Sequence, residues 1–555
     1  MQIVECVPNF SEGRDRSKID QITQEIQSTE GVKLLHVDPG RDTNRTVVTF
    51  IGTPEGAAEA AFKAIARACQ VIDMSVHKGA HPRMGATDVC PFIPLQGITM
   101  AECAALACRL GQRVGDELGI PVYLYEEAAA CPERKNLADI RAGEYEGLAQ
   151  KMQDPAWQPD FGPAAFNARS GATVIGAREF LIAYNVNLNT REKRIASDIA
   201  ASIRETGRPQ KDRDGNIVRD AGGATMRIPG AFAACKAVGW YMPDFGRAQI
   251  SINLTNYKIT PPHIVFDECC RLAESLGARV TGSELVGLIP LDAMLQAGRY
   301  YLQKMKKSPA APESELVHTA VLSLGLNDLY PFEPQRKIIE YQMEQSAPLA
   351  GMTLRQFADV LSTDAPVPGG GSSAALCGSL SAALTSMVAS LTYNRRGYEK
   401  ASPRMAEIGL AAQQLKDELL ADVDRDTASF NKLMEAMRLP KKSAEEKAGR
   451  DNAVELATQE ATLVPLQVLR RSLQAVQLAG EAAEKGFKNS LSDAGGAAVI
   501  ARAAAEGAYL NVLINLQTLQ DSAFCAPIRG EAQKLLAQVK EMAEKIFQQT
   551  ADKLQ

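Results

Sequence analysis

The sequence predicts a multi-domain protein with two α/β subdomains, each a sheet with helices, followed by an all-α helical-bundle domain. Three observations predict this fold class. Between Ile3 and Met305, short β-branched runs alternate with stretches of helical spacing. After Met352 the strand signals vanish, and helical periodicity continues almost to Gln555. The 555 residues can bury two to four domain cores, at roughly 150 residues per domain.

In the first subdomain, apolar residues at helical spacing predict helices at 19–26, 54–72 and 100–118. Alternating or β-branched runs predict strands at 3–7, 32–37, 46–51, 89–95 and 122–125. A turn at 38–42 separates the second strand from the third. This order predicts a layer of sheet with helices on one side.

The second subdomain repeats the alternation, with strands expected at 180–188, 239–241 and 249–254 and helices at 192–205, 261–276 and 291–305. Both units could be βαβ-type halves, with the Pro/Gly-rich stretch 157–171 running through a cleft between them. The polar, aperiodic segment 207–230 predicts an inserted, mobile loop.

These signals place the domain boundaries at 1–179, 180–325 and 350–555, with a proline-bearing linker at 326–349. Long helical stretches in the last domain could form an antiparallel bundle; they cover 405–437, 444–484, 494–519 and 528–546. Pro465 is expected to kink or break the second of them. Two architectures in one chain suggest two activities.

Composition excludes several classes of protein. A net charge of −5 gives no electrostatic footprint for nucleic acid. The N-terminus lacks the basic and apolar regions of a signal peptide, and no apolar run is expected to be long enough to span a bilayer, so no membrane partner is expected. Eleven cysteines without a C-x-x-C motif, together with only five histidines, predict that the chain has no structural zinc site. Reduced thiols and a cytoplasmic location are expected.

The stretch from His77 to Gly85 carries two of the five histidines, four residues apart. Gly79, Pro82 and Gly85 forbid a helix, so the stretch is a shaped loop. A loop that holds histidine, lysine and arginine before an apolar strand suits an acid–base group near an anionic substrate. A plain surface turn with a solvated basic cluster explains the same residues equally well.

Several long motifs resemble known families. The formimidoyltransferase family is matched by 4–13, 74–92, 160–163, 171–173 and 283–288, and the cyclodeaminase family by 368–372, Met387, 391–393, 435–440 and 511–516. The whole chain is therefore similar to the bifunctional formimidoyltransferase-cyclodeaminase family. The segment 207–230 departs from the family by its length.

The resemblance implies a folate enzyme of histidine degradation. The first part would move the formimino group of N-formimino-L-glutamate to N5 of tetrahydrofolate, and the second would close 5,10-methenyltetrahydrofolate and release ammonia. The implied co-substrate is tetrahydrofolate or its polyglutamylated form, and no metal is implied. The family also implies a homo-oligomer.

In the transferase part, His81 matches the family's catalytic position, and a group that titrates near neutrality can both take and give the proton. His77 would orient the loop. Asp38 either stabilises an amidinium or orients the imidazole, or it forms an Asx turn before Pro39. Arg45 either clamps a carboxylate or is a solvated arginine of an edge strand.

The stretch 162–171 matches the family's folate-contacting segment. Glycines would let the backbone approach a pterin, Phe166 would offer a stacking surface and Arg169 a cation. It could equally be a linker that crosses between domains. The implied folate-binding residues are Gly162, Pro163, Ala164, Ala165, Phe166, Asn167, Ala168, Arg169, Ser170 and Gly171.

In the helical domain, a glycine loop before a helix could bind a folate carboxylate or allow close helix packing; it comprises Gly369, Gly370, Gly371 and Ser372. Asp422, Asp424 and Asp426 cannot all share one helix face at two-residue spacing. The family motif implies Asp426 as the acid–base group, with a pKa raised by partial burial. Without the resemblance, all three would be read as a solvated acidic face.

Two other functions compete with this reading. A relative that acts on formyl folates would use a different donor, although a formyl product leaves no ammonia for a cyclodeaminase to release. A non-catalytic folate-binding scaffold would not need His81 or Asp426.

Overall fold

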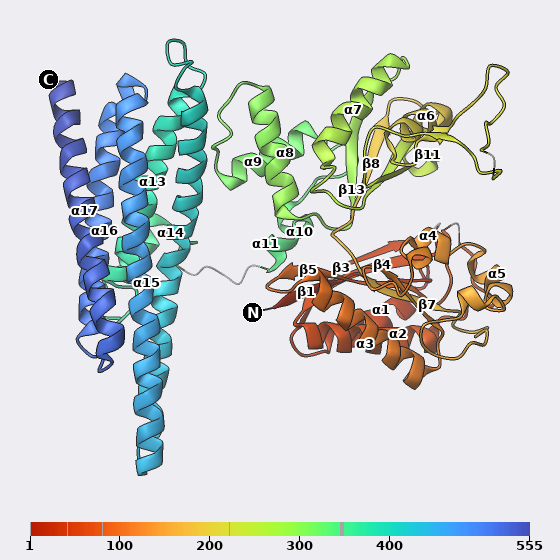
Figure 1. Ribbon diagram of the computed structural model, residues 1–555, viewed down its shortest axis with the longest axis horizontal. Helices are drawn as coiled ribbons and strands as arrows, with labels where there is room; N and C mark the ends of the chain where they lie inside the picture. The colour runs from red at the N-terminus through yellow and green to blue at the C-terminus, as the bar shows by residue number, and fades with distance from the viewer. Residues whose placement is uncertain (1, 42, 80, 221, 344–348) are drawn as a thin grey trace. The chain divides into compact units, whose positions relative to one another are not determined.

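The computed structural model describes residues 2–41, 43–79, 81–220, 222–343 and 349–555 (Figure 1). The chain divides into two compact units, Met1–Ala293 with Val321–Gln342, and Met294–Ala320 with Met343–Gln555. The first unit is built from sheets and helices and the second from helices, which confirms the predicted fold class.

Residues 294–320 belong to the helical unit, whereas the sequence placed them in the second α/β subdomain. Helices α8 (Leu291–Lys304) and α9 (Glu313–Ser323) pack so closely that a Cβ at Gly298 would lie 2.2 Å from the Leu316 carbonyl. The segment is tied to the bundle by a 3.0 Å hydrogen bond from Asn394 Nδ2 to the Lys306 carbonyl. The segment 294–320 therefore belongs structurally to the helical unit.

The first sheet has seven strands in the order β1-β4-β2-β5-β7-β6, with β3 paired to β4. Their bounds are β1 (Ile3–Cys6), β2 (Asn9–Phe10), β3 (Val32–Gly40), β4 (Arg45–Gly52), β5 (Thr87–Gln96), β6 (Val122–Glu126) and β7 (Thr173–Ala177). Strand β7 pairs in parallel with β5 and β6, and the other pairs are antiparallel. The predicted turn at 38–42 is wrong in part, because β3 continues through Gly40.

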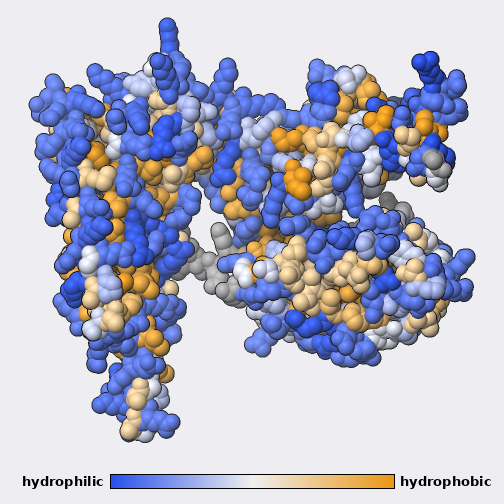
Figure 2. All heavy atoms as spheres, in the orientation of Figure 1, coloured by the Kyte–Doolittle hydropathy of each residue, from blue (hydrophilic) through white to orange (hydrophobic). Residues whose placement is uncertain are grey.

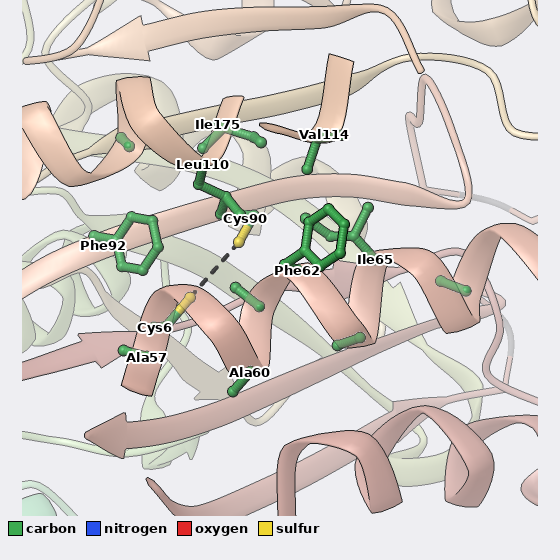
Figure 3. Close-up of a cluster of buried hydrophobic side chains, with 14 of the residues drawn as sticks. Cys6, Ala57, Ala60, Phe62, Ile65, Cys90, Phe92, Leu110, Val114 and Ile175 are labelled. Carbon is green, nitrogen blue, oxygen red and sulfur yellow. Dashed lines mark hydrogen bonds between the residues drawn. The ribbon is translucent and has the colours of Figure 1, made fainter. Parts of the chain in front are cut away.

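Helices α1 (Arg16–Gln27), α2 (Pro54–Val71) and α3 (Met100–Leu118) cover one face of this sheet (Figure 1). A side-chain oxygen caps each helix at its N-terminus, from Asp15, Thr53 and Thr99 respectively. Figure 3 shows Phe62 of α2 packed in the resulting core near Cys90, whose sulfur lies 3.6 Å from that of Cys6.

The second sheet has the order β11-β12-β8-β13, with β8 (Ile182–Leu188), β11 (Cys235–Met242), β12 (Arg247–Leu254) and β13 (Val280–Val286). Every pair in it is antiparallel, so the expectation of a βαβ-type half is wrong here. Helices α6 (Lys193–Ile203) and α7 (Pro262–Ser275) pack on one face, against buried residues such as Val186 and Ile250. Because side chains alternate along a strand, Asn185 and Gln249 point to the opposite, helix-free face.

The inserted segment 207–230 is a small β-structure, which corrects the expectation of an irregular loop. Strands β9 (Arg208–Pro209) and β10 (Arg227–Ile228) pair, and two bridges extend them, between Lys211 and Ile217 and between Arg219 and Thr225. Tight turns at Asp212 and Asp220 reverse the chain, because each carboxylate accepts backbone N–H groups two and four residues on.

The helical unit contains α12 (Leu354–Leu361), α13 (Gly370–Thr392), α14 (Ser402–Met437), α15 (Ala444–Lys485), α16 (Leu491–Leu516) and α17 (Ser522–Leu554). Its core is alanine- and leucine-rich, which lets the helices approach closely. Pro465 lies inside α15 without breaking it.

Two helices of this unit are long and apolar enough to cross a membrane, Gly370–Thr392 and Lys488–Leu516, so the expectation that no apolar run reaches that length is wrong. Their most apolar windows are 56% and 39% buried. Both helices contribute residues to the hydrophobic core, such as Ala382 and Ala501. Burial in the bundle therefore accounts for part of their apolar composition.

Candidate active sites

The loop from His77 to Gly85 lies against the segment 162–171, as two backbone contacts show. Gly85 and Gly171 form an antiparallel bridge, and the Ala86 amide donates to the Ser170 carbonyl at 2.8 Å. Gly171 has a φ of +66°, and a Cβ there would lie 2.1 Å from the Met84 carbonyl. Only glycine allows this approach, so the two stretches meet because of their glycines.

His77 is a buried, structural histidine. Its Nε2 lies 3.0 Å from the Asn44 carbonyl, and its Nδ1 accepts from Arg83 Nε at 3.3 Å. Both ring nitrogens are therefore used, and the ring fastens the loop to the turn before β4.

His81 is half-buried, and its Nδ1 lies 2.7 Å from the Pro82 carbonyl. Because a carbonyl only accepts, Nδ1 carries the hydrogen and the neutral ring presents the lone pair of Nε2. Burial and the positive charges of Arg45 and Arg141 lower the pKa of His81 to about 4. The imidazole is therefore an unprotonated base at neutral pH.

Those two arginines are held by one buried carboxylate, Asp88. Arg45 Nη1 and Arg141 Nη2 both contact Asp88 Oδ2, and the Met84 amide donates to Oδ1 at 3.0 Å. Burial alone would raise the pKa of Asp88, but the two arginines outweigh it and lower that pKa to about 2. A buried guanidinium needs a counterion, and Asp88 supplies it, so a substrate carboxylate would have to share Arg45 with Asp88.

Asp38 lies within β3, half-buried, and its carboxylate makes no hydrogen bond or ion pair with any described residue. It therefore forms no Asx turn before Pro39. It does not orient the imidazole of His81 either, because the hydrogen bond of that ring goes to Pro82. Of the roles predicted for Asp38, stabilising a cationic substrate group is the one its environment leaves open.

The segment 162–171 presents an exposed stretch from Pro163 to Phe166. The ring of Phe166 is 38% exposed and lies 5.3 Å from that of Tyr145, so the expected stacking surface is accessible and has a second aromatic beside it. The guanidinium of Arg169 donates to two carbonyls in the last turn of α2, at 2.6 and 3.3 Å. A folate carboxylate would therefore have to compete with these two carbonyls for the guanidinium of Arg169.

In the helical unit, the glycine loop meets Asp426 of α14. Ser372 Oγ donates to Asp426 Oδ2 at 3.0 Å, and a Cβ at Gly371 would lie 2.1 Å from Asp426 Oδ1. Asp426 is half-buried, and burial raises its pKa although the Ser372 side chain and backbone donate to it. The glycines thus allow a carboxyl group to sit at the start of α13.

The three aspartates of α14 have different partners. Asp422 is buried and paired with Arg471 and, at 2.7 Å, with Arg425. Asp424 accepts from the amides of Leu349 and Ala350 at 2.9 and 3.2 Å, which fastens the chain before α12. Asp426 has no cationic partner among the described residues, as its predicted role in acid–base chemistry requires.

Sequence reasoning missed Asp88, Arg141, Tyr145 and Asn511. Asn511 of α16 lies near the glycine loop, since a Cβ at Gly370 would be 3.2 Å from its Nδ2. Asp88 falls inside the motif 74–92, and a lone carboxylate in an apolar strand was a usable signal, because such a group needs a buried cation.

Fold and sites together define a two-part enzyme, with a neutral histidine in an α/β unit and a half-buried carboxyl in a helical bundle. Three family descriptions cover the chain: formiminotransferase domain, N-terminal subdomain, at 3–178; formiminotransferase domain at 183–344; and formiminotransferase-cyclodeaminase at 353–534. The formimidoyltransferase-cyclodeaminase of Mus musculus is 42% identical over 546 residues, which cover 98% of this chain and 97% of that one. The chain belongs to the formimidoyltransferase-cyclodeaminase family, which confirms the resemblance.

Each part also has a separate relative. The glutamate formimidoyltransferase of Thermoplasma acidophilum is 45% identical over 305 residues, 55% of this chain and 93% of that one. The methenyltetrahydrofolate cyclohydrolase of Methylorubrum extorquens is 36% identical over 202 residues, 36% of this chain and 97% of that one. The two architectures therefore correspond to two modules.

Proposed function

We propose that the chain transfers the formimino group of N-formimino-L-glutamate to N5 of tetrahydrofolate and then cyclises the product to 5,10-methenyltetrahydrofolate with release of ammonia. One observation carries the proposal. A chain that matches the family from end to end holds one half-buried acid–base residue in each unit, His81 and Asp426.

In the transfer step, N5 attacks the amidinium carbon of the donor, and the N5–H proton must reach the departing glutamate nitrogen. Neutral His81 takes that proton at Nε2 while Nδ1–H stays bonded to the Pro82 carbonyl. It then gives the proton to the leaving amine, and the histidine is returned neutral. Such general acid–base catalysis contributes about 10²–10⁴ in rate.

In the cyclisation step, N10 attacks the formimino carbon, and the carbon–nitrogen bond to the departing ammonia breaks. A protonated Asp426 gives its proton to that nitrogen, and the carboxylate then takes the N10 proton. The substrate enters as an amidinium, so its positive charge remains on the methenyl product. The raised pKa of Asp426 favours the protonated starting form.

The test follows methenyltetrahydrofolate absorbance and ammonia together, with tetrahydrofolate and N-formimino-glutamate as substrates. We expect both products from the wild-type protein. Folate binding without either product would refute the proposal and favour a scaffold. Turnover with a formyl donor alone would favour the formyl-folate alternative.

The similarity of the helical part to a methenyltetrahydrofolate cyclohydrolase favours a second candidate activity. In that reaction water would add to the methenyl carbon, and Asp426 would take one proton of the water. One of the two bonds from that carbon to nitrogen would then break, the nitrogen would receive the second proton, and a formyl folate would remain. Incubation with methenyltetrahydrofolate and measurement of its disappearance distinguishes this activity from ammonia release.

We further propose a metal-free, cytoplasmic homo-oligomer that accepts polyglutamylated folate. Proton transfer by His81 and Asp426 needs no metal, and the described residues contain no group of three potential metal ligands. All eleven cysteines are free thiols. Apolar side chains lie on the surface of the bundle (Figure 2). Leu510 and Ile514 of α16 are 64% and 58% exposed, and such side chains suit burial against a second copy. Mass measurement in solution tests the oligomer.

A further inference from the structure

Buried serines of α13 are hydrogen-bonded to the backbone of α14 at regular intervals. Positions 372, 379 and 386 of α13 are serines, and their partners are the carbonyls of residues 423, 416 and 409 of α14. The hydroxyls donate from Ser372 to Val423 at 3.0 Å, from Ser379 to Lys416 at 2.9 Å and from Ser386 to Gly409 at 3.3 Å. The spacing is close to two helical turns on both helices, so the serines fasten two antiparallel helices in register.

Ser372 also reaches the carboxyl group of Asp426. Its Oγ lies 3.0 Å from the Val423 carbonyl, 3.0 Å from Asp426 Oδ2 and 3.4 Å from Thr427 Oγ1. A hydroxyl has one hydrogen to donate, so the two acceptors at 3.0 Å compete for it. Ser372 is 0% exposed, and its hydroxyl is therefore out of reach of a folate carboxylate.

The charge of Asp426 decides which acceptor takes this hydrogen. While Asp426 is protonated, both acceptors are neutral and equally distant, so they can share it. A hydrogen bond to an ionised acceptor is about twice as strong as one to a neutral acceptor. Ionisation of Asp426 therefore draws the hydroxyl to Oδ2, and in agreement the hydrogen bond from Ser372 lowers the pKa of Asp426 against the effect of burial.

The other groups around Asp426 do not change with its proton in this way. Asp422, one turn earlier on α14, is the charged group that acts on Asp426, and its charge raises the pKa of that carboxyl. Asp422 is itself paired with Arg425 and with Arg471 of α15. The residues that α13 and α16 bring to the glycine loop carry no charge: Gly371, Ser372 and Asn511.

We infer that Ser372 is a positioning residue for ammonia release, because its hydroxyl turns from the Val423 carbonyl to Asp426 as that carboxyl gives up its proton. Asp426 gives a proton from Oδ1 to the departing nitrogen, and the hydrogen of Ser372 then points to Oδ2 of the carboxylate. When the carboxylate takes the N10 proton, the hydroxyl turns back. The inference rests on the proposed cyclisation and adds a residue to its site.

This hydrogen bond strengthens only as charge develops on Asp426. An interaction that is stronger in the transition state than in the bound substrate raises kcat and leaves KM unchanged. A folate-binding role of the hydroxyl would act on KM instead, and a purely structural role would be shared by the next serine of α13.

The test measures kcat and KM of ammonia release from 5-formimidoyltetrahydrofolate against pH for Ser372→Ala, with Ser379→Ala as the matched control. Ser379→Ala removes the same kind of bond between α13 and α14, at the Lys416 carbonyl. We expect kcat of Ser372→Ala to fall about 10- to 100-fold, the loss of one hydrogen bond to a charged group, at unchanged KM.

The pH profile gives a second readout. Ammonia release needs protonated Asp426 at the start, so kcat is lost as the pH rises through the pKa of that carboxyl. Loss of the Ser372 hydroxyl raises this pKa, and the basic limb of the kcat profile should move to higher pH. Ser379→Ala should keep the kcat, the KM and the basic limb of wild type.

Three results would overturn the inference. A raised KM at unchanged kcat would place the Ser372 hydroxyl on the folate. Equal losses of kcat in Ser372→Ala and Ser379→Ala would show that the serine only fastens the two helices. A basic limb that stays in place in Ser372→Ala would show that the hydroxyl does not respond to the proton of Asp426.

Failure of the proposed function gives a different result, since wild type would then release no ammonia. A double-mutant cycle of Ser372→Ala and Asp426→Ala, measured on the free energy of unfolding, still shows whether the hydroxyl follows the charge of Asp426. A coupling between the two residues that is larger in alkaline than in acidic solution supports the inference. A coupling that does not change with pH would refute it.

Discussion

Gly371→Ala isolates the chemistry of the helical unit, because it adds one methyl group next to the proposed acid–base residue. The new Cβ would lie 2.1 Å from Asp426 Oδ1 and 2.5 Å from its Cγ, whereas ordinary contacts begin at 3.4 Å. The carboxyl group must therefore retreat by more than about 1 Å, a misplacement that costs about 10²-fold in rate. We expect ammonia release from 5-formimidoyltetrahydrofolate to fall by at least that factor.

Gly370→Ala is the matched control at the neighbouring glycine. Its Cβ would meet only the amide end of Asn511, at 3.2 Å, a side chain that can give way. Ammonia release should stay within about threefold of wild type, and formimino transfer should be unchanged in both variants because it belongs to the other unit. Equal losses in the two variants, or full activity of Gly371→Ala, would refute the geometry assigned to Asp426.

Three further predictions concern charge. His81 has a pKa of about 4, so the rate of transfer should fall only as the pH approaches 4. Arg141→Met removes a cation that lowers this pKa, and it should therefore move the acid limb of the pH profile of kcat to higher pH. An acid limb that does not move would show that Arg141 does not act on His81. Asp422→Ala removes a buried partner of Arg471 and should destabilise the bundle by about 3 kcal/mol without changing ammonia release per folded molecule, whereas a specific loss of activity would place Asp422 in the site. Burial raises the pKa of Glu5 to about 8 from its ordinary 4.5. The contribution of protonated Glu5 to the stability of the folded protein is therefore complete below pH 4.5 and is lost as the pH rises to 8. Glu5→Gln should therefore raise the thermal midpoint at pH 8 more than at pH 5, and a pH-independent difference would exclude ionisation of Glu5 as the cause.

Local patterns in the sequence predicted much of the fold. The isoleucines of α1 share one buried face, as their helical spacing predicted, and Gly79, Pro82 and Gly85 make the His77–Gly85 stretch a loop. These features depend on residues close in sequence, whose spacing decides which face is buried.

Long-range pairing escaped prediction. Strand β7 is a five-residue run that becomes a strand by lying between β5 and β6. Asp88 binds arginines 43 and 53 residues away, and no spacing rule connects them.

The candidate sites show the same division. The family motifs named His81 and Asp426, and the environments of both residues suit acid–base chemistry. The state of each group depends on burial and on charges from other elements, so it needed the fold. The ion pair of Arg45 with Asp88 was not predicted, because no spacing rule connects the two residues.

The central claim is that one chain holds two separate acid–base sites used in series. Mixing two variants that each lack one of the two activities tests this claim most directly. His81→Ala should make no formimidoyltetrahydrofolate but still release ammonia from it, and Asp426→Ala should accumulate that intermediate. Together, the two variants should form methenyltetrahydrofolate from tetrahydrofolate and N-formimino-glutamate. A mixture that stays inactive although each variant is folded, or a His81→Ala variant that transfers at the wild-type rate, would contradict the account.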